Sequence, residues 1–291
     1  MPTEITRSAL IADYECDTGE GPLWHPAENR LYWLDIPNGR LFRYDPASGE
    51  HEIAYERDGP IGGYTIEPDD RLVLFEEEGR IEVWDDGSTE VLVERLPGET
   101  DSRFNDVIAD PRGGVFAGTM QQGESPGRLY RFDPDGSHTV IEEGVATSNG
   151  LGFTPDLEHL YFTETGEETV YRYRYDRSTG EVSDREILLE FDDAPGHPDG
   201  MTVDSMGYLW IAFWDGGRIE RLSPDGELDQ TFEFPAKKVA SVTLAGPDLS
   251  TAYATCAGGS NKAEEGDGAG ALFGFSAGVR GLPEFRSGLT E

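Results

Sequence analysis

Residues 30–46 read RLYWLDIPNGRLFRYDP, and the pattern of this stretch decides the fold. Two short runs, 30–34 and 39–44, alternate apolar and polar residues, and aromatic residues fill many of the apolar positions. Alternation with a period of two predicts β-strands rather than helices. The Asp45-Pro46 pair that follows predicts a hairpin turn. The stretch therefore predicts two consecutive strands and the turn that leads out of them.

The same pair of strand-like segments occurs six times, in a unit of roughly 40–50 residues. The pairs are 30–34 with 39–44, 71–75 with 79–84, 114–118 with 127–132, 159–163 with 170–173, 208–212 with 217–222, and 251–255 with 270–275. Each unit has room for four strands, and units of this length are typical of propeller blades. The chain is therefore predicted to be an all-β, six-bladed β-propeller, with four-stranded antiparallel blades around a central channel.

We expect residues 1–291 to form this propeller as a single domain. A further strand-like segment, 8–15, precedes the first repeat. It is expected to close the ring by pairing with the last blade, because closure leaves the sheets without a long free edge.

The charge of the chain restricts its partners. It has 58 acidic and 23 basic residues, a formal net charge of −35, and only three lysines. Such a surface repels nucleic acid and anionic membranes, so we expect neither as a partner. Two explanations remain, an acidic partner-binding face or adaptation to a salt-rich cytosol. The even spread of the acids favours the second, which predicts a halophilic source and salt-dependent stability.

The remaining composition predicts a cytoplasmic protein. No apolar run is long enough to span a membrane, and the first ten residues lack the basic and apolar regions of a signal peptide. Cys16 and Cys256 lack the spacing of a zinc or redox motif. We expect two buried free thiols, with one disulfide between them as the alternative. We expect a monomer or a small homo-oligomer.

Polar residues interrupt the repeat about ten residues before each aromatic strand, where the innermost strand of a blade should begin. These segments are 19–24, 61–64, 102–106, 147–151, 198–201 and 239–242. Because they recur in phase with the repeat, Glu20, Asn149 and Asp199 are expected to point at one place on the channel axis. Two carboxylates and an amide oxygen suit a hard divalent cation. We call these six stretches the entrance segments.

Each of these residues also has an ordinary structural explanation. Asp199 precedes Gly200, and an isolated Asp-Gly pair is typical of a turn. Glu20 could be a solvated loop acid, and Asn149 could be a left-handed turn residue before Gly150. Arg103 could form a structural ion pair, since Asp101 and Asp106 lie next to it in the sequence. The common phase of the entrance segments favours a shared site.

Together the motifs resemble the SMP-30/gluconolactonase/regucalcin family of six-bladed propellers. The matching stretches are GEGPLW at 19–24, RFND at 103–106 with AGTM at 117–120, SNGL at 148–151, and PDGM at 198–201 with GGR at 216–218. The resemblance implies a metal ion held by Glu20, Asn149 and Asp199, with Asp199 also acting as the general base. It implies substrate contacts from Arg103 and Asn105.

The chain departs from the family pattern at one place. Some members carry an acidic residue shortly after Gly-Thr-Met that contacts sugar hydroxyls, whereas this chain has Gln121-Gln122-Gly123-Glu124. Gln121 or Glu124 is expected to replace it, and we assign the substrate contact to Gln121.

These observations predict a hydrolase acting on carboxylic esters that opens a sugar lactone, a small-molecule substrate. It would use water and one divalent metal cation: calcium, magnesium, manganese, zinc or ferrous iron. Two alternatives remain, an organophosphate hydrolase and a non-catalytic propeller that binds calcium or a partner. Oxygen donors accompanied by Arg103 and Asn105 favour an enzyme, because a propeller that only binds a partner does not require them.

Overall fold

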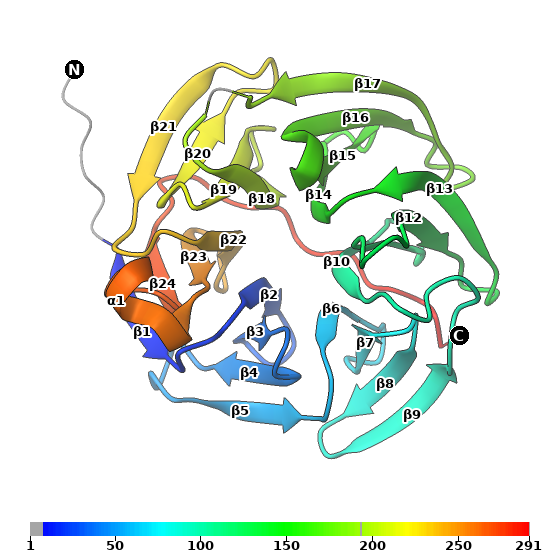
Figure 1. The fold of residues 1–291 in the computed structure, drawn as a ribbon, viewed down its shortest axis with the longest axis horizontal. Coiled ribbons are helices and arrows are strands. Elements are labelled where there is room, and N and C mark those ends of the chain that lie inside the picture. Colours follow the sequence, from blue (N-terminus) through cyan, green and yellow to red (C-terminus); the bar gives the residue numbers. More distant parts are fainter. Residues whose placement is uncertain (1–7, 193, 291) are drawn as a thin grey trace.

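A computed structural model of the protein describes residues 8–192 and 194–290. Within them, 24 strands form six four-stranded antiparallel sheets that surround a central axis as blades (Figure 1). The predicted six-bladed β-propeller is confirmed. Residues 1–7, part of the stretch in which we expected no signal peptide, lie outside the described residues.

The blades follow one another along the chain. Blade 1 contains β2 (Gly19–His25), β3 (Arg30–Asp35), β4 (Arg40–Tyr44) and β5 (His51–Glu56). Blade 2 contains β6 (Ile61–Ile66), β7 (Leu72–Glu76), β8 (Ile81–Asp85) and β9 (Ser88–Val93). Blade 3 contains β10 (Phe104–Ala109), β11 (Val115–Thr119), β12 (Gly127–Phe132) and β13 (His138–Val145).

The second half of the ring repeats this order. Blade 4 contains β14 (Ser148–Phe153), β15 (His159–Glu164), β16 (Thr169–Tyr175) and β17 (Val182–Glu190). Blade 5 contains β18 (His197–Val203), β19 (Leu209–Trp214), β20 (Arg218–Leu222) and β21 (Leu228–Glu233). Blade 6 contains β22 (Val239–Ala245), β23 (Thr251–Cys256), β24 (Ala271–Ser276) and β1 (Ala9–Asp13). The short helices are η1 (Thr165–Glu167), η2 (Gly259–Asn261) and α1 (Lys262–Glu265).

The two ends of the propeller sequence meet in blade 6. Strand β1 pairs antiparallel with β24, with Ala9 opposite Gly274 and Asp13 opposite Ala271. The predicted strand at 8–15 therefore closes the ring. This pairing gives the last blade its fourth strand, so every blade has the same number.

The hydrophobic core lies between the blades rather than at the centre. The innermost strands β6, β14 and β22 are buried along their whole length, whereas the outermost strands β5 and β17 are largely exposed. Six apolar clusters each join two neighbouring blades. Between blades 5 and 6, the ring of Phe232 lies 4.9 Å from Trp210 and 5.0 Å from Phe275. Because these interfaces hold the ring together, the central channel is left for other side chains.

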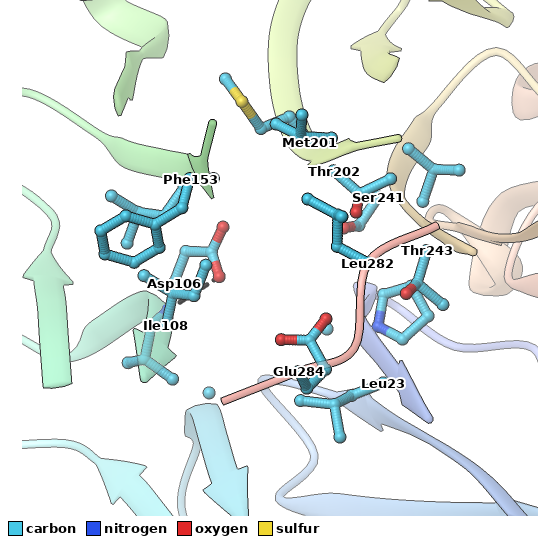
Figure 2. A pocket seen from close by; sticks show the side chains of 18 of the residues that line it. Leu23, Asp106, Ile108, Phe153, Met201, Thr202, Ser241, Thr243, Leu282 and Glu284 are labelled. Carbon is cyan, nitrogen blue, oxygen red and sulfur yellow. Dashed lines mark hydrogen bonds between the residues drawn. The ribbon is translucent and has the colours of Figure 1, made fainter. Parts of the chain in front are cut away.

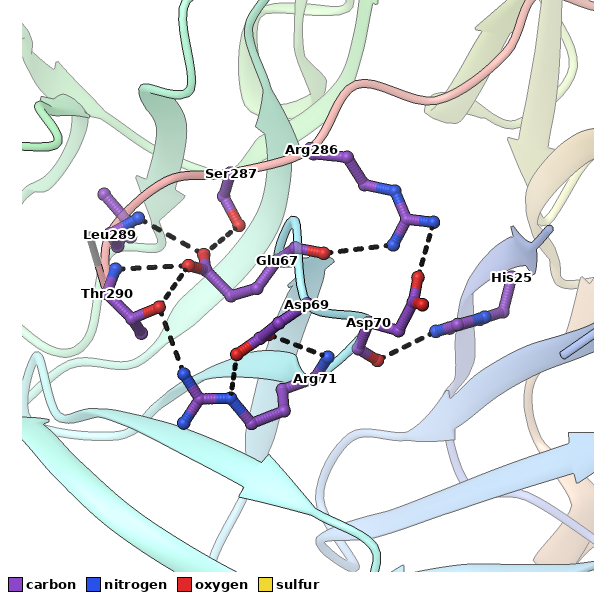
Figure 3. A network of polar contacts seen from close by, with 9 residues as sticks. All are labelled: His25, Glu67, Asp69, Asp70, Arg71, Arg286, Ser287, Leu289 and Thr290. Atoms are coloured by element: carbon purple, nitrogen blue, oxygen red, sulfur yellow. Dashed lines mark hydrogen bonds and ion pairs between the residues drawn. The ribbon is translucent and has the colours of Figure 1, made fainter. Parts of the chain in front are cut away.

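The chain ends in a strap, residues 277–290, which crosses the propeller from blade 6 to blades 2 and 3 (Figure 1). Its end is held by Glu67, in the turn after β6 (Figure 3). The buried Glu67 carboxylate accepts hydrogen bonds from the Ser287 hydroxyl at 2.6 Å and the Thr290 hydroxyl at 2.7 Å. The backbone N–H groups of Leu289 and Thr290 donate to it as well. Since Glu67 follows the innermost strand, the strap covers the end of the channel opposite the entrance segments.

Two further expectations concern single features. Cys16 and Cys256 are buried and unbonded, which confirms two free thiols. No helix among residues 8–192 and 194–290 is long and apolar enough to cross a membrane.

Candidate functional site

Every innermost strand is irregular where it begins. In each blade the pairing between the first and second strands shifts register within the entrance segment. The shifts fall between Glu20 and Leu23, Ile61 and Gly63, Phe104 and Asp106, Asn149 and Leu151, Pro198 and Met201, and Val239 and Ser241. A β-bulge bends a strand and redirects its side chains. Six bulges in the same phase therefore turn the polar residues of the entrance segments away from the sheets.

Glycine is required at the bulges of blades 2 and 4 because neighbouring innermost strands touch there. A Cβ atom on Gly62 would lie 1.8 Å from the backbone oxygen of Phe104. On Gly150 it would lie 2.7 Å from the backbone oxygen of Asp199. The Asn149-Gly150 and Asp199-Gly200 pairs are thus sites of close contact between strands, and not only turns. The contact brings the strand of Asn149 against the strand of Asp199.

The three predicted oxygen donors are buried at the starts of β2, β14 and β18. Their exposed fractions are 8% for Glu20, 5% for Asn149 and 4% for Asp199. Burial, with a smaller contribution from repulsion by Asp106, raises the pKa of Glu20 to about 8. Burial, followed by repulsion from Glu20, raises the pKa of Asp199 well above its usual range. The charge of Glu20 therefore reaches Asp199 and opposes its ionisation.

Arg103 is the positive group of the site. Burial lowers its pKa to about 10, and attraction to Glu20 and Asp199 opposes this decrease. Its Nη1 donates to the Phe104 carbonyl at 2.9 Å and to Oδ1 of Asn105 at 2.7 Å. Among the ion pairs of the described residues, none joins Arg103 to Asp101 or Asp106. The structure therefore does not support the structural ion pair that the sequence left open.

Asn105 lies between Arg103 and Asn149. Its Nδ2 donates to Oδ1 of Asn149 at 2.9 Å and to the Ser148 carbonyl at 2.8 Å. The structure therefore brings Asn105 directly against one of the predicted metal ligands. Because both ends of its side-chain amide are engaged, Asn105 links Arg103 to the oxygen donors.

Gln121 lies apart from this group, on the exposed loop between β11 and β12. Its Nε2 donates to the Gly123 carbonyl at 3.1 Å, and its backbone N–H donates to Ala146 at 2.8 Å. The second bond holds the loop beside the start of β14. The Glu124 side chain is also exposed. Within the described residues neither side chain bonds to Glu20, Asn149 or Asp199.

The donor set fits a hard divalent cation by its chemistry. The described residues contain no group of three or more His, Cys, Asp and Glu side chains placed to bind a metal. The entrance site differs because it combines two carboxylates with the Asn149 amide. Burial raises the pKa of both carboxyl groups, and a neighbouring cation would favour the ionised form of each. All three donors are oxygens, which calcium and magnesium prefer.

Comparison with known proteins places this geometry in a family. Residues 18–258 match the sequence profile described as SMP-30/Gluconolactonase/LRE-like region, and all six entrance segments lie within them. The chain belongs to this family.

Individual members of the SMP-30/gluconolactonase family match nearly the whole chain. The chain is 48% identical to Pentonolactonase XacC from Haloferax volcanii over 284 residues, which cover 95% of this chain and 97% of that protein. It is 31% identical to regucalcin from Bos taurus over 290 residues, covering 93% and 94% of the two chains. The solved structure of a luciferin-regenerating enzyme superposes with a TM-score of 0.88 at 29% identity, covering 97% of this chain and 99% of that one.

Below the entrance, this SMP-30/gluconolactonase family member has a cavity of about 90 Å³ in the channel. Asp106 from β10 and Glu284 from the strap point into it from different sides (Figure 2). Burial raises the pKa of each carboxyl to about 7, and repulsion from Glu284 adds to the effect on Asp106. Glu20, Asn149 and Asp199 do not line this cavity. It is therefore a second, inner compartment of the channel.

Sequence reasoning missed three residues of this region. Asp106 was considered only as an ion-pair partner for Arg103, although it lies in an entrance segment. Glu284 lies in the strap, for which the repeat makes no prediction. Thr165 lies in the loop after β15, where its hydroxyl contacts Asn149. No local pattern marks Thr165, because its partners belong to other strands.

Proposed function

We propose that the protein is a divalent-metal-dependent hydrolase that opens the ring of a sugar lactone. The main support is the pair of buried carboxylates, Glu20 and Asp199, at the channel entrance. The Asn149 amide and the Arg103 guanidinium lie in the same entrance region. Family membership and 48% identity to a pentonolactonase support this activity.

The residues of the entrance suit the binding of one cation. Glu20 and Asp199 would supply two negative charges, and Oδ1 of Asn149 a neutral oxygen. Calcium, magnesium, manganese, zinc and ferrous iron all accept oxygen donors to some degree. Similarity to regucalcin, and the all-oxygen donor set, make calcium and manganese suitable first choices for titration.

Ring opening needs a nucleophile, a proton acceptor and a proton donor. A divalent ion at these three donors would polarise the lactone carbonyl and increase the acidity of a water molecule. Water adds to the carbonyl carbon, the bond from that carbon to the ring oxygen breaks, and the ring oxygen takes up a proton. We assign the acceptance of the water's proton, and its delivery to the ring oxygen, to the Asp199 carboxylate.

Arg103 would orient the substrate. Among the described contacts only its Nη1 is engaged, which leaves Nε and Nη2 free to donate to substrate oxygens. Its pKa of about 10 keeps the guanidinium protonated at neutral pH. Asn105 is fixed on both sides, so we propose that it acts mainly by holding Asn149 and Arg103. Gln121 would contact sugar hydroxyls only if its loop turns toward the entrance.

A pentonolactone is the first substrate to test, because the 48% identical relative is named for that activity. The net charge of −35 and the similarity to a Haloferax protein also lead us to propose that the enzyme works in a salt-rich cytosol. Assays therefore belong in molar potassium chloride.

The test is lactone hydrolysis by chelator-stripped protein, supplied with one divalent ion at a time. We expect negligible turnover without metal, after subtraction of spontaneous hydrolysis, and restored turnover with at least one ion. If an ion binds but no pentonolactone, hexonolactone or phosphotriester is hydrolysed, the enzyme proposal fails. The entrance would then be an ion-binding site without catalysis.

A further inference from the structure

Thr165 is the first residue of η1, in the loop between β15 and β16. Its Oγ1 accepts a hydrogen bond from Nδ2 of Asn149 at 2.8 Å. The same hydroxyl donates to the backbone oxygen of Pro198 at 2.7 Å. One hydroxyl therefore connects β14, which carries Asn149, to β18, which carries Asp199.

These bonds determine how the Asn149 amide is turned. A carbonyl oxygen can only accept, so the single hydroxyl proton of Thr165 is used on Pro198. The hydroxyl then offers only lone pairs to Asn149, and the amide must present its NH₂ group to Thr165. Oδ1 of Asn149 consequently faces the other way, toward Asn105.

These bonds belong to a chain of hydrogen bonds whose other end is Arg103. That end requires the same orientation of the Asn149 amide. A guanidinium group can only donate, so the Asn105 amide must turn its Oδ1 toward Arg103. Nδ2 of Asn105 is then directed at Oδ1 of Asn149. The chain runs in one direction from a group that only donates to a group that only accepts. Oδ1 of Asn149 keeps a second lone pair for an ion.

The Thr165 hydroxyl is itself held in place. The backbone N–H of Thr165 donates to the carbonyl of Thr147 at 3.1 Å. The buried carboxylate of Glu164 accepts from the N–H of Thr147 at 2.6 Å. The loop is thus tied to the residues just before Asn149. A β-branched side chain also has few rotamers, so the hydroxyl position is well defined.

The Thr165 hydroxyl bonds to Pro198 at the edge of the register shift in blade 5. The pairing of β18 with β19 shifts register between Pro198 and Met201, which includes Asp199. The regular pairing thus ends at Pro198, which lies opposite Phe213, and resumes only at Met201. Thr165 supplies a hydrogen bond to the peptide before Asp199 from the neighbouring blade.

We propose that Thr165 is a positioning residue of the ion site. Its hydroxyl sets which end of the Asn149 amide faces the ion and anchors the peptide that precedes Asp199. The inference rests on the proposed function, because it assumes that Asn149 and Asp199 bind an ion.

Three variants of the full chain test it. Thr165→Val removes the hydroxyl but keeps the shape, and Thr165→Ser keeps the hydroxyl. Thr163→Val is the matched control. Thr163 lies on β15, opposite Asn149 of β14, and its buried Oγ1 has no hydrogen-bond partner among the described residues. The readouts are the Kd for Mn²⁺ by calorimetry, kcat and KM for a pentonolactone, and the thermal midpoint. All titrations are made at a temperature where every variant is folded.

We expect Thr165→Val to weaken Mn²⁺ binding by about 10–100-fold, the range seen when a residue that orients a metal ligand is lost. Thr165→Ser should stay within about threefold of the wild type, and Thr163→Val should be unchanged. Equal Mn²⁺ affinity in Thr165→Val and Thr163→Val would overturn the positioning role. A loss in Thr165→Ser as large as in Thr165→Val would overturn it too. A wild-type chain that binds no ion refutes both proposals, whereas one that binds an ion without turnover refutes only the enzyme.

Discussion

Nδ2 of Asn105 lies 2.9 Å from Oδ1 of Asn149, and this bond joins the innermost strands of blades 3 and 4 at the channel entrance. The resemblance to the family implied that Asn105 contacts substrate. The geometry also gives Asn105 a contact with a proposed ion ligand.

Asn105→Ala distinguishes these roles. If Asn105 supports Asn149, the variant should weaken ion binding by about tenfold and lower kcat/KM, because an outer partner of a ligand is lost. The measurement is ion affinity by calorimetry beside lactone kinetics. A rise in KM with unchanged ion affinity would show that Asn105 serves the substrate alone.

The channel cavity makes stability depend on pH through Glu284. Its pKa is about 7 in the folded protein and near 4.5 in an unfolded chain. The folded state therefore binds the proton more tightly, so this group's contribution is fully present below about pH 4.5 and is lost as the pH rises through 7. Glu284→Gln should remove that loss and raise the free energy of unfolding by about 1–2 kcal/mol at pH 8.

Denaturant unfolding of both proteins at pH 5 and pH 8 checks this. The difference between Glu284→Gln and the wild type should be larger at pH 8. Equal differences at the two pH values would mean that Glu284 is not held at a raised pKa in the cavity.

The strap depends on Glu67. Its buried carboxylate accepts hydrogen bonds from Ser287, Leu289 and Thr290 (Figure 3). Glu67→Ala leaves these donors without their partner and should lower the free energy of unfolding by about 2–4 kcal/mol. Asp69→Ala is the control, since Asp69 is in the same turn but forms an exposed pair with Arg71. Asp69→Ala should lower the free energy of unfolding by no more than about 0.5 kcal/mol. Similar losses in the two variants would show that Glu67 does not hold the strap.

Salt should stabilise the protein because of its net charge of −35. Raising potassium chloride from 0.1 to 2 M shortens the screening length from about 10 Å to less than about 3 Å, which weakens repulsion between the acids. We expect the thermal midpoint to rise by about 5–15 °C. Chloride is the suitable anion, because sulfate strengthens hydrophobic burial by itself. A midpoint that does not change with potassium chloride would contradict the halophilic interpretation.

The fold could be predicted because each blade repeats the same local pattern. The strands that contain Trp33, Trp210 and Phe273 are recognisable by alternation, and the repeat period gives their number. The phase of the repeat also predicted that Glu20, Asn149 and Asp199 lie where innermost strands begin, and each of them lies at a bulge there.

The remaining parts of the site depend on contacts between blades. Thr165 bonds to residues 16 and 33 positions away, and no short sequence pattern reports such pairs. Glu67 meets the strap more than 200 residues later in the chain. The inner cavity exists only because the strap crosses the channel, so Glu284 could not be recognised from its neighbours in sequence.

Asp199 is central to the proposed mechanism, because we propose that it both binds the ion and accepts the proton from water. The most direct measurement is kcat for a pentonolactone in Asp199→Asn, at an ion concentration that saturates the variant. We expect kcat to fall by at least about 100-fold, even when the ion is bound, because the amide cannot accept the proton. If the ion-bound Asp199→Asn variant keeps a kcat within about threefold of the wild type, Asp199 does not accept the proton from water.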